Sequence, residues 1–407
     1  MVSTRGSLAA AKGTNSATAA TATTDNTKKA RKRRPTSKPS SQKTPPKKSK
    51  TSNVAETTKA KSKVLTDIQH NDRSKPLLDL TESDDLVSVT LVQRPSKRNR
   101  SPYVADVLLN DDGGSSGSSS SSREVICHVP NLDIGGKCIP GAMMLVKPAR
   151  DRQGMLVGST AVSPKYGTPK CEFISQLLCV DETKIGYSPP TWVGAHPSLG
   201  EKIAEQLLER NCLYPRLPKI ESFQREVRNI GGSDMRADFL IHFAKDDDSG
   251  TPHKPCVLEV KTVVDTDFAP DRLPDRTKCV FVGQAQPYQR AGIFPWGQSN
   301  QKGPNGEKVV SARAIKHVRE LTKLAKGELK GAAGEEYQCA VLFVVVRKDA
   351  IYFRPNHEAC PSFCEYLKQA EDAGVHVLAK RVEWGDTDDT LGQCHEGPLL
   401  DIVWPKL

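Results

Sequence analysis

Long apolar runs are absent from this chain of 407 residues. No stretch approaches the ~20 consecutive apolar residues of a membrane-spanning helix, which predicts a soluble protein with no membrane partner. A secretory signal with an apolar centre is also missing. The 11 cysteines are odd in number and irregularly spaced, so no disulfide framework is indicated and a reducing compartment is favoured.

Acidic residues are nearly absent from one end of the chain. Residues 1–55 hold thirteen Lys and Arg against Asp25 alone, a net charge of +12, whereas the whole chain carries +11. The remaining residues are therefore close to neutral. If they bind a polyanion such as nucleic acid, local patches must do so rather than the overall charge.

The first part of the chain, residues 1–95, has little to bury and is predicted to be a disordered basic tail. Its clusters "KKARKRRP" (28–35) and "PPKKSK" (45–50) indicate a nuclear localisation signal, or a solvated basic tail that binds phosphates. An organelle transit peptide is the alternative, because residues 1–24 are rich in Ser, Thr and Ala and contain no acid.

One short segment of the tail differs from its surroundings. Leu77–Asp85, "LLDLTESDD", runs from leucines into an acidic cluster. This pattern resembles a SUMO-interacting motif, which adds a strand to the edge of a partner's sheet while its acids meet basic residues. SUMO, or a SUMO-modified protein, is therefore a candidate partner, and a stray amphipathic patch is the alternative.

Residues 96–195 contain short apolar runs separated by Gly, Pro and Ser. Regular turn-bounded strands of this kind predict a small β-barrel or sandwich. Aromatic residues, only 5% of the chain, are few here. The runs predicted to be strands are 98–109, 123–131, 141–149, 167–181 and 184–194.

Residues 196–407 alternate between helical and extended patterns, which predicts a mixed α/β domain. Ser198 and Ser311 are expected to cap the first two helices. Residues 265–308 are rich in Pro, Gly, Asp and Gln and are expected to form a long loop. The predicted helices are 196–211, 311–327 and 361–374, and the predicted strands are 222–229, 236–243, 255–264, 337–347 and 375–384.

Three charged residues interrupt two of these apolar strands. Asp238 lies in "RADFLIHF" (236–243), and Glu259 and Lys261 lie in "CVLEVKT" (256–262). Residues two apart on a strand share a face, so two carboxylates and one ammonium converge if the strands are neighbours. Two carboxylates suit Mg²⁺, which activates water and offsets charge on a phosphate, and the lysine can orient the water. A solvated Glu–Lys pair at the end of a sheet is the alternative.

Ten motifs follow one another along the chain: "SPYVADVLL", "ICHVPN", "PGAMMLVKP", "EKIAEQLLERN", "FQREV", "MRADFLIHF", "CVLEVKTV", "SARAIKHVREL", "AVLFVVVRKDAIYFRP" and "AEDAGVHVLAKRVEW". Their order resembles the sugar fermentation stimulation protein family over roughly residues 98–403. The resemblance implies an OB-like barrel, a restriction-endonuclease-like domain with the PD-(D/E)xK signature, and DNA binding. Asp238, Glu259 and Lys261 match its metal and catalytic positions, with Mg²⁺ or Mn²⁺ as cofactor.

The same resemblance supplies further candidate residues. Glu205, on the helix before the strands, is placed where such folds carry an extra acid for metal or water. Arg225 and Arg236 match family positions and are candidates for nucleic-acid contact. The helix motif adds three more, expected to form one polar face towards a phosphate: Arg313, Lys316 and His317.

Two features depart from the family pattern. "VPNLDIGGK" (129–137) lacks the expected Thr-Gly pair, and the segment 265–308 is longer than expected and could cover the site. Three functions therefore stay open: a Mg²⁺-dependent DNA phosphodiesterase, a non-catalytic DNA-binding or transcription-regulatory protein, and a nuclear interaction protein acting through its tail.

Overall fold

A computed structural model describes residues 62–64, 75–82, 86–110, 123–131, 134–183, 189–245, 250–269 and 287–405. Both basic clusters of the tail lie outside these residues, as does the candidate transit segment. Within the described part of the chain, no helix is both long enough and apolar enough to cross a membrane.

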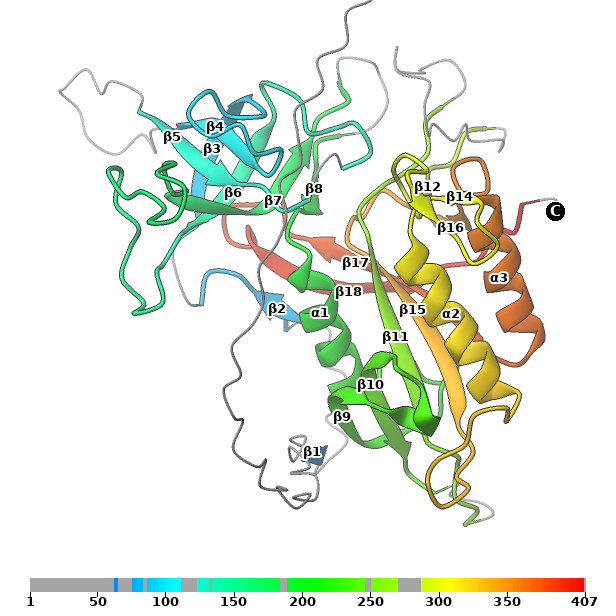
Figure 1. The fold of residues 1–407 in the computed structure, drawn as a ribbon. Helices are drawn as coiled ribbons and strands as arrows, with labels where there is room; N and C mark the ends of the chain where they lie inside the picture. The colour runs from blue at the N-terminus through cyan, green and yellow to red at the C-terminus, as the bar shows by residue number, and fades with distance from the viewer. Residues whose placement is uncertain are drawn as a thin grey trace, which may run out of the picture. The chain divides into compact units, whose positions relative to one another are not determined.

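The first folded region is a closed barrel of antiparallel strands (Figure 1). A parallel pairing between Cys127 and Phe173 closes it, joining β5 to β7. This arrangement confirms the OB-like barrel. The strands are β3 (Val87–Gln93), β4 (Val104–Leu109), β5 (Glu124–His128), β6 (Met143–Pro148) and β7 (Phe173–Val180), with β8 (Thr191–Gly194) added beside β7.

The expected tail boundary at residue 95 is wrong. Strand β3 lies before it and pairs with both β4 and β6. Its residues Val89 and Leu91 are buried in the barrel core. The apolar residues alternate over only a few positions next to a polar tail, so composition hid a short strand that tertiary pairing stabilises.

The second region is a mixed sheet of eight strands in the order β1-β9-β10-β11-β15-β17-β18-β2. Strands β11, β15 and β17 are parallel, and the flanking strands are antiparallel. The strands are β1 (Ser62–Val64), β9 (Ile220–Arg228), β10 (Arg236–Phe243), β11 (Cys256–Val263), β15 (Gln338–Val345), β17 (His376–Trp384), β18 (Gln393–Leu399) and β2 (Leu78–Asp79).

Helices cover both faces of this sheet (Figure 1). Helix α1 (Ser198–Glu209) packs through Ile203 and Leu207 on a face that includes Phe239 and Leu258. Helices α2 (Ala312–Ala325) and α3 (Pro361–Asp372) pack on the opposite face, which includes Val257, Val341 and Phe343. The alternation of the two cores along each strand confirms the predicted α/β class.

The segment 265–308, predicted to be a long loop or insertion, contains short strands. It contributes β12 (Ala291–Phe294), β13 (Gln301–Lys302) and β14 (Lys308–Val309), although residues 270–286 lie outside the described part. Strand β12 pairs in parallel with β16 (Tyr352–Pro355). A short 3₁₀ turn, Ile230–Gly232, precedes β10.

Of the two expected caps, one is confirmed. The Ser311 hydroxyl accepts a hydrogen bond from the Ala314 N–H at 3.3 Å, at the start of α2. Ser198 does not cap α1, because its hydroxyl lies 2.7 Å from Nδ1 of His196 and the helix begins without a side-chain cap.

Replacement of Ser311 by Ala is expected to lower the free energy of unfolding by about 1 kcal/mol, because the Ala314 N–H loses its acceptor. Urea unfolding followed by circular dichroism measures this loss. The matched control is Ser198→Ala, which should cost less because no helix N–H depends on that hydroxyl. An equal loss in both variants would contradict the capping role.

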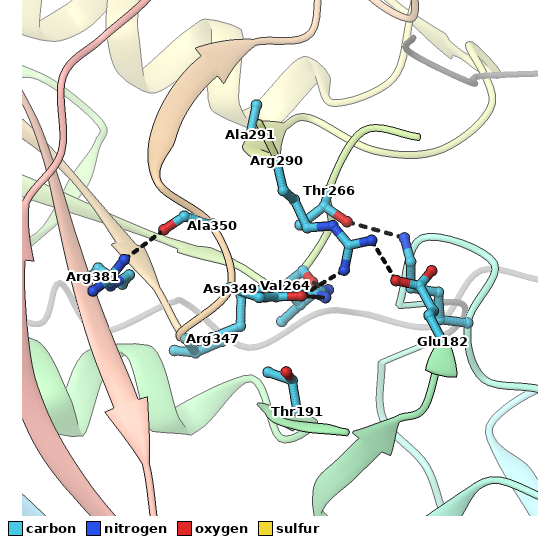
Figure 2. Close-up of polar contacts among 12 residues, drawn as sticks. Glu182, Thr191, Val264, Thr266, Arg290, Ala291, Arg347, Asp349, Ala350 and Arg381 are labelled. Atoms are coloured by element: carbon cyan, nitrogen blue, oxygen red, sulfur yellow. Dashed lines mark hydrogen bonds and ion pairs between the residues drawn. The ribbon is translucent and has the colours of Figure 1, made fainter. Parts of the chain in front are cut away.

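A buried ion-pair network lies where the barrel meets the sheet (Figure 2). The Arg290 guanidinium donates to Glu182, on the loop after β7, and to Asp349 at 2.6 Å. Asp349 also accepts from Arg347, whose side chain is fully buried and also donates to the Val264 carbonyl at 3.0 Å. Nearby, the Lys137 ammonium donates to the Thr266 hydroxyl at 3.0 Å, and burial lowers its pKa to about 7.

Candidate functional site

The site residues meet where β10 and β11 separate. The two strands pair as far as Phe239 and Leu258, so the next positions along the two strands are Asp238 and Glu259. Beyond this point the Val260 N–H donates its hydrogen bond to the Asp238 carboxylate, at 2.7 Å, instead of to the backbone of β10. The geometry therefore places two carboxylates side by side on adjacent strands.

Glu259 is almost fully buried, with 2% of its surface exposed. Its Oε1 atom accepts a hydrogen bond from Lys261 and another from Nδ1 of His317 at 2.5 Å. Burial would raise the pKa of Glu259, but the His317 hydrogen bond and the Lys261 charge outweigh it, so this pKa lies below its usual value. Glu259 is therefore ionised at neutral pH.

The other oxygen of Glu259 has no partner. Oε2 is buried and makes no hydrogen bond. An ionised, buried oxygen without a donor is costly, and such atoms are rare unless they serve a ligand. A cation bound beside this atom would supply the missing partner.

The pKa of Asp238 shifts in the opposite direction from the pKa of Glu259. Burial raises the pKa of Asp238 to about 6, with help from the negative charges of Glu259 and Glu201 and against the opposing effects of the Val260 hydrogen bond and Lys261. Two adjacent carboxylates with pKa values pushed apart are typical of catalytic and metal sites.

The backbone opposite Asp238 is strained. In the β9–β10 pairing, Ala237 faces Val227 and Phe239 faces Arg225, so Glu226 lies across from Asp238. Glu226 has a φ of 54°, in the left-handed region that residues other than glycine seldom adopt. Strain of this kind is concentrated at functional sites, where the surrounding structure compensates for it.

Glu205 is not part of the group around Asp238. It forms an ion pair of 2.7 Å with Arg225. The acid of α1 that acts on Asp238 is Glu201, one helical turn earlier on the same face. The start of α1 lies directly on β11, where a Cβ at Gly200 would lie 1.9 Å from the Thr262 hydroxyl. The four-residue spacing was the signal that could have suggested Glu201.

The predicted nucleic-acid contacts are divided between two places. Arg313 and Lys316 are exposed on α2, whereas His317 is 6% exposed and turned inward to Glu259. The expectation of one polar face is therefore wrong, since consecutive helix residues are ~100° apart. Arg225 is held by Glu205, away from the other cations.

An open pocket of about 420 Å³ lies between the start of β10 and the start of α2. Across this pocket the Lys316 ammonium donates a hydrogen bond to the Asp234 carboxylate at 2.7 Å. Arg236 forms an ion pair with Glu226 at 3.1 Å. His317 connects this pocket to the buried Glu259. The lining residues are Asp234, Met235, Arg236, Ala312, Arg313, Lys316 and His317.

The donor set fits a small, hard divalent cation. No three His, Cys, Asp or Glu side chains in the described ranges converge closely enough to hold an ion by themselves. Two carboxylates are nevertheless sufficient for Mg²⁺, which usually keeps several of its waters. The unpartnered Oε2 of Glu259 and the carboxylate of Asp238 are the atoms that fit.

These features define the class of protein. A mixed sheet with helices on both faces, preceded by an OB-like barrel, is a restriction-endonuclease-like arrangement, and Asp238 and Glu259 lie where two of its strands separate. Comparisons with known proteins show which family the chain resembles. Residues 308–388 match the model of the sugar fermentation stimulation protein RE domain. Over most of its length the chain is similar to proteins of the sugar fermentation stimulation protein family.

Several curated relatives carry that family name. A homolog from Acaryochloris marina is 25% identical over 73% of this chain and 87% of its own length. One from Shewanella baltica is 26% identical over 73% and 92%. Among solved structures, that of Pyrococcus furiosus SfsA in complex with Ca²⁺ aligns with a TM-score of 0.48 and 17% identity, covering 81% of this chain and 99% of that one.

Proposed function

We propose that this chain is a DNA-binding protein that hydrolyses phosphodiester bonds with Mg²⁺, or Mn²⁺, at the Asp238–Glu259–Lys261 site. The observation that carries the proposal is the buried, ionised Oε2 of Glu259, which has no hydrogen-bond donor and lies beside a second carboxylate. A divalent cation would remove this cost and lower the pKa of Asp238.

Each protein group has a distinct task in this mechanism. Asp238 and Glu259 would hold the ion, which supplies a more acidic water and offsets the negative charge that develops on the phosphate. Lys261 and His317 hold Oε1 of Glu259, which leaves Oε2 directed for binding. Arg236, Arg313 and Lys316 line the adjacent pocket and would contact the phosphates of the strand.

The direct test is a cleavage assay with single-stranded, duplex and supercoiled DNA in Mg²⁺, Mn²⁺ or EDTA. Lys261→Ala is expected to reduce cleavage by at least about a hundredfold, because Glu259 loses a positioning donor and the phosphate loses a nearby cation. Lys254→Ala is the matched control, since Lys254 is an exposed lysine that pairs with Glu336 at 2.8 Å away from the site.

The outcomes of this assay discriminate between the functions. Equal cleavage by the wild type and Lys261→Ala would identify a contaminating nuclease. DNA binding that is unchanged in Lys261→Ala, with no cleavage under any condition, would identify a non-catalytic DNA-binding regulator. One observation favours that second candidate: Oε1 of Glu259 already accepts from both Lys261 and His317, so only Oε2 of this carboxylate is left for a cation.

A paired substitution tests which acid of α1 serves the site. Glu201→Gln is expected to alter the metal dependence of cleavage, because the negative charge of Glu201 raises the pKa of Asp238. Glu205→Gln should alter it less, since the Glu205 carboxylate is engaged with Arg225. The reverse result would return the role to Glu205.

The proposed SUMO contact has a structural condition. Leu77 and Leu80 are buried, and β2 already pairs with β18 through Leu78 and Asp79. Arg210 also holds the carbonyls of Lys75 and Pro76. A partner strand would therefore pair with the outer edge of β2 and would not replace β2.

Nuclear import would depend on the two basic clusters of the tail.

A further inference from the structure

The outer surface of α2 carries a continuous row of cations. Buried side chains, including Ile315, Val318 and Leu321, fix the inward face of the helix. The outward positions recur at spacings of three or four residues, so they form a single ridge along the helix. Its members, here called the α2 ridge, are Arg313, Lys316, Arg319, Lys323 and Lys326.

Two acids partly neutralise the α2 ridge. Glu320, the only acid between residues 312 and 326, is engaged by Ser233 at 2.9 Å and by Lys323 at 2.7 Å. Asp234 pairs with Lys316 at 2.7 Å. An ordinary solvated helix face mixes charges of both signs, with acids and bases four residues apart. With five cations against these two acids, the ridge keeps a net positive charge.

The ridge continues beyond the start of the helix. The β13–β14 hairpin presents two more exposed cations, Lys302 and Lys308. The hairpin is fixed to α2 because the Gln301 side chain accepts a hydrogen bond from the Ala312 N–H at 2.9 Å. The basic surface thus passes the pocket that adjoins Glu259 and extends along the whole of α2.

Neighbouring side chains hold part of this surface in place. The Arg319 guanidinium lies over the ring of Tyr366 on α3, 5.3 Å from its centre. The Tyr366 hydroxyl also accepts from Asn305 of the hairpin at 3.3 Å. The cations are therefore presented from packed elements, which lowers the entropy lost when they meet a ligand.

We propose that the α2 ridge binds the sugar–phosphate backbone of duplex DNA that extends from the catalytic pocket. This inference rests on the proposed function of that pocket. The 14-residue helix is ~21 Å long, which matches about six base steps of a duplex. The helix contains no Phe, Tyr or Trp, so it offers backbone contacts without a stacking platform for single-stranded bases.

The test compares two full-length triple variants in EDTA, so that binding is measured without cleavage. The ridge variant is Arg319→Gln, Lys323→Gln, Lys326→Gln, which leaves the pocket cations intact. The control is Arg216→Gln, Lys245→Gln, Lys254→Gln, which removes three exposed cations elsewhere. Affinity for a 25-base-pair duplex and for a single strand of the same length is measured against salt concentration.

We expect the ridge variant to lose about tenfold or more in duplex affinity at moderate salt. The slope of log affinity against log salt should become shallower by about 2 to 3, because each lost phosphate contact contributes ~0.9. The control should keep the wild-type slope. A double variant, Arg319→Gln, Lys326→Gln, preserves the Lys323–Glu320 pair and should lower the slope by about 2 even if the triple variant is less stable.

Several results would overturn the proposal: a wild-type slope in the ridge variant, an equal change in the control, or an equal loss on the single strand. A cleavage assay separates this failure from failure of the proposed function. If the pocket is catalytic and the ridge only binds, the ridge variant should raise KM and keep kcat. Absence of cleavage in the wild type would reject the nuclease while leaving the binding result valid.

Discussion

Asp238→Asn is expected to make the metal-free protein more stable above pH 6 while abolishing metal-dependent cleavage. The folded environment raises the pKa of Asp238 from 3.8 to about 6, mainly through burial. Between these values the folded state binds more protons than the unfolded state, so stability falls as pH rises through this window. The ionised carboxylate then costs up to about 3 kcal/mol, which Asn avoids.

The measurement is thermal or urea unfolding in EDTA from pH 4 to pH 8. The stability of the wild type should fall as the pH rises from about 4 to 6. The stability of Asp238→Asn should depend less on pH, and at pH 8 this variant should unfold at a higher temperature or urea concentration than the wild type. Asn can still accept the Val260 hydrogen bond. Asp386→Asn is the control, because Asp386 is an exposed acid paired with Lys348 and should show no such gain.

Mg²⁺ should reverse the order of stability. The ion binds the folded wild type and adds stability by mass action, whereas Asp238→Asn lacks one of the two carboxylates. Cleavage should fall on the order of a thousandfold in the variant, since the metal is the main source of charge stabilisation. A variant that is less stable than the wild type at pH 8 in EDTA, or that cleaves normally, would contradict the assignment of Asp238.

Asp349→Ala is expected to cost about 3 to 5 kcal/mol of unfolding free energy, because the fully buried Arg347 loses its carboxylate partner and Arg290 loses one of its two. Arg347 is fully buried and Arg290 is 6% exposed, and both donate to Asp349 (Figure 2). Burial would raise the pKa of Asp349, but the two arginines outweigh it and hold the pKa well below its usual value.

The sign of the pH dependence follows from this shift. Because the folded pKa is depressed, the stabilisation by Asp349 is present above pH ~4 and lost as pH falls through the folded pKa. Denaturant unfolding at pH 7 measures the loss, with Asp388→Ala, an exposed acid, as control. A loss below about 1 kcal/mol would mean that water replaces the carboxylate and that the network contributes little.

Local patterns were enough to predict much of the fold. The three helices in the second domain were expected from apolar periodicity, and their observed bounds lie within the predicted ranges. Strands β10, β11, β15 and β17 were expected from apolar runs. Strand β3 and the edge strand β2 were missed, because each is short and depends on partners that are distant in sequence.

The sequence by itself determined that charged residues occupy alternate positions in apolar strands, since the period of a strand places Glu259 and Lys261 on one face. It also determined the sign and location of the tail's charge. These properties are local, so they can be read from residue type and spacing.

Only the tertiary structure decided what those charges meet. Packing of α2 on the sheet brings His317 to Glu259, and α1 brings Glu201 towards Asp238 while Arg225 takes Glu205. The pKa values and the unpartnered Oε2 of Glu259 depend on burial and on neighbours from several elements. No local pattern specifies these contacts, because they arise when separate helices and strands pack together.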